Sequence, residues 1–192
     1  MMLRRRPDIS VIIPTCRPAK LIYCLEQLNR QVVPVDLVVE TIVVTEMSLS
    51  DIPLPRSCEV LIKDLGGNCG ASARDLGIAI SRGRYLSFWD DDNIYMPHAL
   101  LTQYMAAYGN DVGVVQIDHW DGLQYHRLPL RLPNNLVLGD VDTMCLCVRR
   151  EVAVKEKWDD HKGIGTDYYW LEKILKRGAS LNFVPVAIGE HL

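Results

Sequence analysis

The chain has 192 residues, of which 48% are hydrophobic and 23% are charged, and its formal net charge is −3. This length and apolar content suit one compact domain over residues 1–192. The charge provides no basic excess for nucleic acid, and no apolar run approaches the roughly 20 residues that span a bilayer. Because no signal peptide precedes the first predicted strand, we expect a cytoplasmic protein with at most peripheral membrane contact, through the basic residues Arg4, Arg5 and Arg6.

Buried strands alternate with helical patterns along the chain. The hydrophobic pattern predicts strands at residues 8–13, 37–45, 58–63, 84–89, 112–117, 142–150 and 182–188, and helices at 18–31, 71–82, 97–108 and 166–178. We expect Pro14 to end the first strand. This alternation is typical of an α/β domain with a mainly parallel central sheet that is covered by helices on both faces.

Residues 118–140 show no sustained period, and we expect a long loop there. Its aromatic residues either stack on a substrate or pack the loop down. The six cysteines are scattered and form no CxxC pair, which argues against a zinc site. We expect reduced thiols in or near the core, because disulfides are rare in the cytosol. They are Cys16, Cys24, Cys58, Cys69, Cys145 and Cys147.

Three consecutive aspartates, Asp90, Asp91 and Asp92, follow a predicted buried strand. Like charges at this spacing repel each other, and burial strengthens the repulsion, so a positive group should lie beside them. Mg²⁺ and Mn²⁺ prefer carboxylate oxygens, and an open coordination sphere leaves room for phosphate. Ligands of such sheets bind beyond the carboxyl ends of the strands, where Thr15 and Thr45 also fall. The sequence therefore predicts a divalent cation shared with a diphosphate; the alternative is an aspartate-rich turn that caps the next helix.

Two further residues have a functional and a structural interpretation. His191 follows the last predicted strand and is either an exposed terminal residue or a ligand of Mn²⁺, to which imidazole binds well. Asp167 lies in the first turn of a predicted helix. There it either interacts with the helix dipole or acts as a general base that takes a proton from a hydroxyl.

Three segments in this order resemble the inverting family 2 glycosyltransferases, which have the GT-A (Rossmann-like) fold. They are "ISVIIPTCRP", "GGNCGASARDLGIAISRGRYLSFWDDDN" and "GTDYYWLEKILKRG". The second is the most specific: it combines a glycine or asparagine turn, the triplet Ala73-Arg74-Asp75 in place of Ala-Arg-Asn, and an Asp-rich metal motif of the DXD type after an apolar strand. The resemblance covers nearly the whole chain except residues 118–140.

The resemblance implies a hexosyltransferase-like enzyme (EC 2.4) with a nucleotide-binding half, residues 1–110, and an acceptor and catalytic half, residues 111–192. Its donor would be a nucleotide-diphosphate sugar, with a UDP-sugar favoured, and its acceptor an unknown hydroxyl. Pro14, Thr15 and Arg17 would lie against the base and ribose, and Arg74 would contact the base or the diphosphate.

The same resemblance assigns the acidic residues. Asp90 would hold the ribose or the sugar, Asp92 would ligate Mn²⁺ or Mg²⁺, and Asp91 is a further donor-binding candidate. Asp167 matches the second residue of the family's Glu-Asp pair, the catalytic base, although Thr166 replaces the first.

A second departure concerns the nucleobase. The family usually has Asp-Asp-Gly-Ser after its second strand, where an aspartate reads the base. This chain has Thr45-Glu46-Met47-Ser48, so Glu46 or Thr45 would take that contact and the uridine preference stays open.

Other functions remain as alternatives to inverting transfer: a retaining GT-A transferase, or a module that binds nucleotide-sugar without turnover. A nucleotidyltransferase would need a glycine-rich phosphate loop after the first strand, whereas "PTCRPAK" has no glycine.

Overall fold

The structure is a computed structural model that describes residues 5–49, 52, 54, 58–62, 70–130, 137–158 and 165–192. Several features of the sequence analysis lie outside these residues. They are Arg4, Lys63 at the end of the third predicted strand, the turn residues 66–69 with Cys69, and residues 131–136 of the predicted loop.

The described residues form nine strands and five α-helices. The strands are β1 (Ile9–Thr15), β2 (Val39–Thr45), β3 (Cys58–Ile62), β4 (Tyr85–Phe88), β5 (Ile94–Tyr95), β6 (Val112–Trp120), β7 (Tyr125–Leu128), β8 (Leu146–Arg149) and β9 (Leu181–His191). The helices are α1 (Pro18–Asn29), α2 (Ala71–Ile80), α3 (Ala99–Ala107), α4 (Arg150–Ala153) and α5 (Thr166–Lys176), with a short 3₁₀ turn η2 (Thr143–Cys145) before β8.

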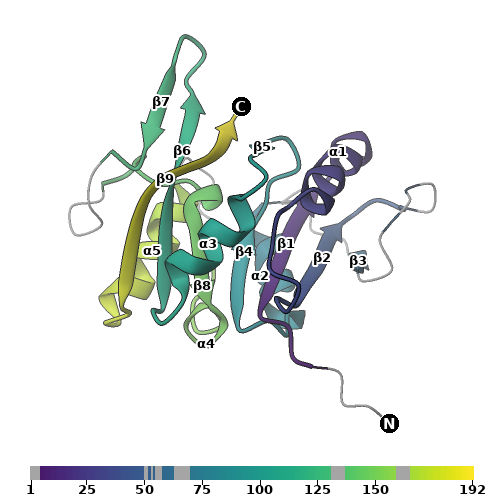
Figure 1. Ribbon diagram of the computed structural model, residues 1–192, viewed down its shortest axis with the longest axis horizontal. Coiled ribbons are helices and arrows are strands. Elements are labelled where there is room, and N and C mark those ends of the chain that lie inside the picture. Colours follow the sequence, from purple (N-terminus) through teal and green to yellow (C-terminus); the bar gives the residue numbers. More distant parts are fainter. Residues whose placement is uncertain are drawn as a thin grey trace.

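These strands form one mixed sheet in the order β3-β2-β1-β4-β8-β6-β9-β5, with β7 also paired to β6 (Figure 1). Strands β3, β2, β1 and β4 are parallel, and β6 and β9 are parallel to each other. Strand β8 runs antiparallel between β4 and β6. The expected single α/β domain is confirmed. Besides β8, the short edge strand β5 and the hairpin strand β7 are antiparallel to their neighbours.

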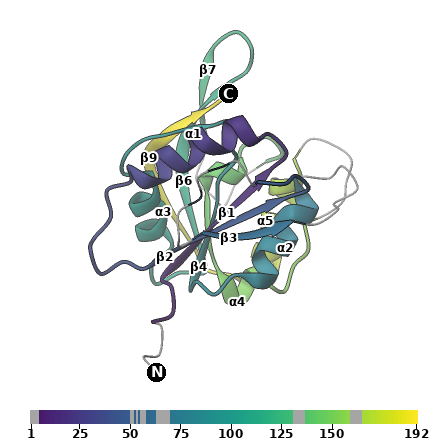
Figure 2. The ribbon, with the colours of Figure 1, turned by 90° about the vertical axis from the view of Figure 1, so that its right-hand side faces the viewer.

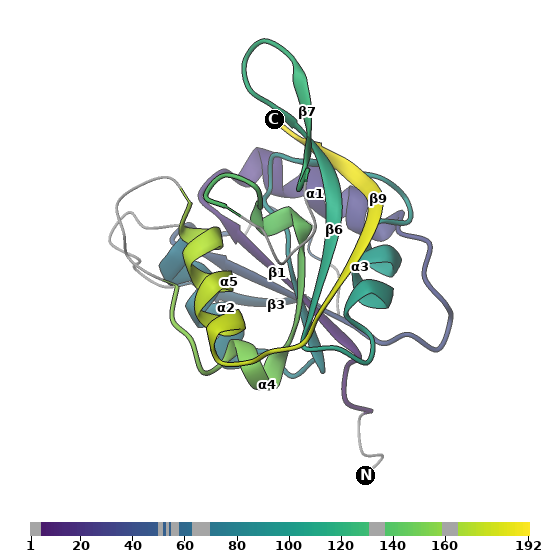
Figure 3. The same cartoon turned by 90° about the vertical axis from the view of Figure 1, so that its left-hand side faces the viewer.

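Helices cover both faces of the sheet, as expected. Figures 2 and 3 show α1 and α3 on one face and α2, α4 and α5 on the other. The central strands are fully buried because both faces are covered, and all seven residues of β1 are inaccessible to solvent or nearly so. Within the described ranges, no helix is long and apolar enough to cross a membrane.

Two local predictions are wrong. Strand β1 does not end at Pro14 but continues to Thr15. Its pairing with β4 stops at Ile12, so Pro14 and Thr15 pair with β2 alone. Proline is tolerated where a strand has a partner on one side only. The start of the predicted loop is instead a β-hairpin, in which β7 pairs with the end of β6 and projects from the domain (Figure 1).

The described cysteines are free thiols, which agrees with the expectation. Cys24, Cys145 and Cys147 are buried, and burial raises the pKa of each thiol. Cys16 is exposed, contrary to the prediction, because it follows the end of β1.

The topology brings several chain segments to one edge of the sheet. The carboxyl ends of β1, β2 and β4 meet there because these strands are parallel. Strand β8 enters at this edge because it is antiparallel to β4. Strands β6 and β9 end there because each runs in the direction of β4. Ligand sites of α/β sheets form at such an edge.

Candidate active site

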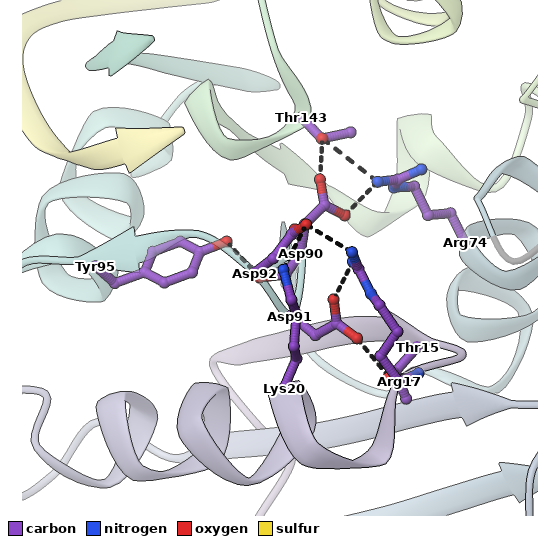
Figure 4. A network of polar contacts seen from close by, with 9 residues as sticks. All are labelled: Thr15, Arg17, Lys20, Arg74, Asp90, Asp91, Asp92, Tyr95 and Thr143. Atoms are coloured by element: carbon purple, nitrogen blue, oxygen red, sulfur yellow. Dashed lines mark hydrogen bonds and ion pairs between the residues drawn. The ribbon is translucent and has the colours of Figure 1, made fainter. Parts of the chain in front are cut away.

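The middle aspartate of the triplet points into the protein. The Thr15 hydroxyl donates a hydrogen bond to Asp91 Oδ2 over 2.5 Å, and the Arg17 guanidinium pairs with Asp91 Oδ1 (Figure 4). Only 1% of the Asp91 side chain is exposed. Burial raises the pKa of Asp91, and the contacts with Thr15 and Arg17 oppose this rise. Asp91 therefore ties the end of β4 to the β1–α1 turn.

The outer two aspartates are more accessible and have their own cationic partners. Asp92 Oδ2 lies 2.7 Å from Arg17 Nη1 and 3.4 Å from Lys20 Nζ in α1. Burial alone would raise the pKa of Asp92, but the two cations outweigh it and lower the pKa. Asp90 pairs with Arg74 of α2. The triplet is thus matched by three cations of the chain.

Asp90 also contacts the second half of the chain. The Thr143 hydroxyl donates to Asp90 Oδ2 over 3.1 Å, and Arg74 lies 3.5 Å from the same hydroxyl (Figure 4). The guanidinium of Arg74 also stacks over Trp158, with its central carbon 5.2 Å from the ring centroid. Arg74 is therefore held from several sides in a fixed orientation.

A cavity of about 240 Å³ opens among these groups. It is lined by Pro14, Thr15, Cys16, Arg17, Gly70, Arg74, Asp90, Asp91 and Asp92. The structure thus brings together six of the seven residues predicted to bind the donor, and Asp92 with them. The exception is Glu46, which follows β2 and is not among the described residues that line the cavity.

Asp142 is a site residue that the sequence analysis missed. It precedes η2, and its Oδ1 accepts a hydrogen bond of 2.8 Å from the Met144 amide. Burial raises its pKa, and the negative charge of Asp90 adds to this. The hydrophobic pattern predicts a strand over the whole of residues 142–150, so it gives no signal for the turn that presents Asp142 beside Asp90.

Asp167 lies in the first turn of α5, as predicted, and its Oδ1 accepts a hydrogen bond of 2.9 Å from the Tyr168 amide. Burial raises the pKa of Asp167 to about 6, with a further contribution from the charge of Asp142. A carboxylate with this pKa can accept a proton near neutral pH. This supports the general-base interpretation, although Asp167 is not among the described residues that line the 240 Å³ cavity.

His191 ends β9 and is part of the sheet. Its Nε2 lies 3.5 Å from Asp142 Oδ2, and its Nδ1 lies 2.7 Å from Nδ1 of His119 on β6. Burial lowers the pKa of His119, and the neighbouring ring of His191 lowers it further. The interpretation of His191 as an isolated, exposed terminal residue is therefore wrong, because it packs against groups at the site edge.

A divalent cation is compatible with the oxygen donors at this edge. Among the described residues, no three His, Cys, Asp or Glu side chains form a ready-made metal site. However, Mg²⁺ and Mn²⁺ in phosphate-transferring sites commonly bind one or two carboxylates and take their other ligands from phosphate and water. Asp90 and Asp92 suit this role, with 21% and 24% of their side chains exposed, whereas Asp91 is committed to Thr15 and Arg17.

The chain belongs to glycosyl transferase family 2: the family's profile matches residues 10–133, more than half of the sequence. This match confirms the family resemblance seen in the sequence. No curated protein matches the chain significantly.

Its fold is shared with GT-A glycosyltransferases of known structure. Residues 1–349 of TarS from S. aureus are 18% identical, with a TM-score of 0.72, and the match covers 96% of this chain and 60% of that one. TarS 1–349 in complex with UDP-GlcNAc is 17% identical, with a TM-score of 0.70, and the match covers 95% of this chain and 58% of that one. The mannosyltransferase PcManGT from Pyrobaculum calidifontis, in complex with GDP-Man and Mn²⁺, is 16% identical, with a TM-score of 0.67. The match covers 98% of this chain and 57% of that one. The chain thus spans about three fifths of the length of these proteins.

The role of Arg17 can be tested by replacing it with Met. This substitution leaves the buried Asp91 without its cation, so we expect a loss of about 1–3 kcal/mol of unfolding free energy at pH 8. The pKa of Asp91 would rise further, and protonation would remove the unpaired charge, so the loss should be smaller at pH 4.5. Urea unfolding at both pH values measures this.

The matched control is Arg30→Met, because Arg30 is an exposed cation at the end of α1 that pairs only loosely with Glu26, at 3.7 Å. We expect a change within about 0.5 kcal/mol for this variant. An equal loss at both pH values for Arg17→Met would contradict a charge-based role.

Proposed function

We propose that the chain transfers a sugar from a nucleoside-diphosphate sugar to an acceptor hydroxyl with inversion of the anomeric centre. The observation that carries this proposal is the cavity beyond β1 and β4, whose three carboxylates pair with three cations of the chain, two of which, Arg17 and Arg74, also line it. Such an arrangement suits a ligand with both an anionic diphosphate and a counter-cation. Family membership supplies the class of reaction.

The donor would bind along this cavity. Pro14, Thr15 and Arg17 would lie against the base and ribose, and Arg74 against the diphosphate, because its guanidinium faces the cavity from the first turn of α2. Asp90 would hold the ribose or sugar hydroxyls. Asp91 would act indirectly, by fixing Thr15 and Arg17.

The nucleobase is proposed as uracil first and guanine second. TarS has been solved with UDP-GlcNAc and PcManGT with GDP-Man, so neighbours of this fold bind both. The family's base-reading aspartate is replaced here, and Glu46 or Thr45 would take its place. The buried Thr45 hydroxyl accepts a hydrogen bond of 3.0 Å from the Met47 amide, which shapes the turn after β2.

Asp92, together with His191, would hold Mn²⁺ or Mg²⁺, which when bound offsets the charge that develops on the leaving diphosphate. Arg17, Lys20 and Arg74 add positive charge on the protein side of the cavity. Asp167 would remove the proton from the acceptor hydroxyl as this attacks from the face opposite the diphosphate. A retaining reaction would not need a base in that position.

We assign residues 1–110 to donor binding and residues 111–192 to the acceptor and catalysis, and we expect the protein to work in the cytoplasm, with at most peripheral membrane contact. The second assignment is supported by the hydrogen bond of Thr143 to Asp90, by the distance of 3.5 Å between His191 and Asp142, and by the charge of Asp142, which raises the pKa of Asp167.

Donor binding predicts metal-dependent stabilisation. At 100 times the dissociation constant, a nucleoside diphosphate should raise the unfolding free energy by about 2.7 kcal/mol. Thermal unfolding with UDP or GDP, each with and without Mn²⁺, measures the effect. Adenosine diphosphate provides the comparison for base selectivity. Absence of a shift with every nucleotide and metal would refute the proposed donor class.

General-base catalysis predicts a selective defect in Asp167→Asn. The amide cannot take the acceptor proton, so transfer should fall by about 10²–10⁴-fold while donor affinity stays unchanged. Isothermal titration with UDP or GDP and Mn²⁺ measures the affinity, and sugar release or transfer measures the rate. Glu172→Gln is the control, because Glu172 lies on the same helix and pairs with Lys176 near the surface. Near-normal turnover by Asp167→Asn would favour the helix-dipole interpretation. Donor binding without any turnover in the unaltered protein would favour the binding-module alternative.

The pKa of Asp167 predicts the pH dependence of the reaction. The base works as the carboxylate, and its pKa is raised to about 6, so the transfer rate should rise with pH through about 6 and level off above it. Initial rates at saturating donor between pH 5 and 8 test this. A flat profile over that range would mean that Asp167 keeps the pKa of an ordinary aspartate or is not the base.

A further inference from the structure

A buried glutamine, Gln103 of α3, lies between this helix and the sheet. Its side chain is inaccessible to solvent, and α3 packs against β4 and β8 (Figure 1). Burying an amide costs free energy unless the amide is hydrogen-bonded, so a glutamine in an apolar helix–sheet interface needs specific partners. The proposed reaction gives this residue no role of its own.

The amide of Gln103 joins two segments that are far apart in the chain. Its Oε1 accepts hydrogen bonds from the Ser87 hydroxyl over 2.8 Å and from the Trp89 indole N–H over 3.2 Å. Its Nε2 donates a hydrogen bond of 2.8 Å to the Met144 carbonyl. Ser87 is in β4 and Trp89 directly follows that strand, whereas Met144 is in η2. Gln103 thus bridges the segment that leads into the triplet and the turn that precedes β8.

This bridge lies where the backbone pairing between the two segments ends. Within the described ranges, the ladder between β4 and β8 stops at the pair formed by Ser87 and Cys147. Trp89 and Met144 lie beyond this last pair, toward the edge of the sheet that carries the site. The amide of Gln103 therefore fixes the spacing of the two segments at a point where the sheet no longer does so.

The bridge also lies one residue away from a contact of the site. Trp89 directly precedes Asp90 in the chain. Met144 directly follows Thr143, whose hydroxyl donates to Asp90 Oδ2 over 3.1 Å (Figure 4). By holding both neighbours, the amide holds this contact, and with it the carboxylate that pairs with Arg74 at the donor cavity.

We propose that Gln103 is a positioning residue for donor binding. Through Trp89 and Met144 it keeps Asp90 and Thr143 at the spacing that the nucleotide requires. The inference rests on the proposed function, in which Asp90 holds the ribose or the sugar. Gln103 is not among the described residues that line the cavity, so it acts through its neighbours. A misplacement of about 1 Å in such a site can cost about 100-fold in rate, so the loss of this bridge is measurable.

The test is nucleotide binding by Gln103→Met, whose side chain has a similar length and volume but makes none of these hydrogen bonds. Isothermal titration with UDP or GDP and Mn²⁺ measures the affinity without any assay of activity, and thermal unfolding measures stability separately. We expect an affinity about 10-fold lower than that of the unaltered protein, because Asp90 and Thr143 lose their fixed spacing.

The matched control is Gln31→Met, because Gln31 is also a bridging glutamine. Its Nε2 donates to the Met96 carbonyl and its Oε1 accepts from the Leu100 amide, each over 2.9 Å. These partners lie just after β5 and in the first turn of α3, and neither is among the described residues that line the donor cavity. This variant should lose stability and keep the nucleotide affinity of the unaltered protein.

A double-mutant cycle separates positioning from a general loss of stability. Thr143→Val removes the hydroxyl that donates to Asp90, so it should weaken nucleotide binding by itself. If Gln103 acts through this contact, the double variant should bind about as weakly as the weaker single variant, whereas independent effects would multiply. If Gln103→Met does not fold, Trp89→Phe takes its place in the cycle, because it removes the indole N–H and keeps an aromatic ring.

Unchanged nucleotide affinity in Gln103→Met would overturn the inference and leave the proposed function in place. A double variant whose loss equals the product of the two single losses would do the same. An equal loss of affinity in Gln31→Met would assign the effect to stability and not to positioning. Absence of nucleotide binding by the unaltered protein would refute the proposed function, and the inference with it.

Discussion

The site depends on the way in which the protein neutralises its own aspartate triplet. Asp91 is buried between Thr15 and Arg17, so it anchors the end of β4 to the β1–α1 turn. The turn after β4 buries the Asp91 side chain and leaves those of Asp90 and Asp92 more accessible at the cavity. Removing one partner of such a buried charge costs more than the pair contributes, which makes Arg17 a structural as well as a ligand-facing residue.

The reversed strand β8 joins the two halves of the chain at this point. Because β8 runs antiparallel to β4, the residues that precede it meet those that follow β4. This places Asp142 and Thr143 beside Asp90. The negative charge of Asp142 also raises the pKa of Asp167 on α5. The raised pKa of Asp167 is thus a consequence of sheet topology as well as of burial.

The sequence predicted the parts of the site that depend on local pattern. The triplet after an apolar strand, Asp167 in a helical first turn and the layered α/β arrangement are readable because each follows from periodicity or from a strand end. Asp142 and His119 were not predicted, because their positions depend on the direction of β8 and on the register of β6 with β9. The hairpin was missed because its paired residues, such as Asp118 and Arg127, are polar and give no hydrophobic alternation.

The positive group that the triplet required is present within the chain, and this bears on how a cation would enter. Three carboxylates against Arg17, Lys20 and Arg74 leave little net charge to hold a free dication. A bound diphosphate would compete for the same three cations and would leave Asp92 free to hold the metal ion. In the proposed reaction, nucleotide and cation would therefore strengthen each other's binding. The diphosphate pairs with the cations of the chain, and the metal ion neutralises the carboxylate that these cations no longer contact.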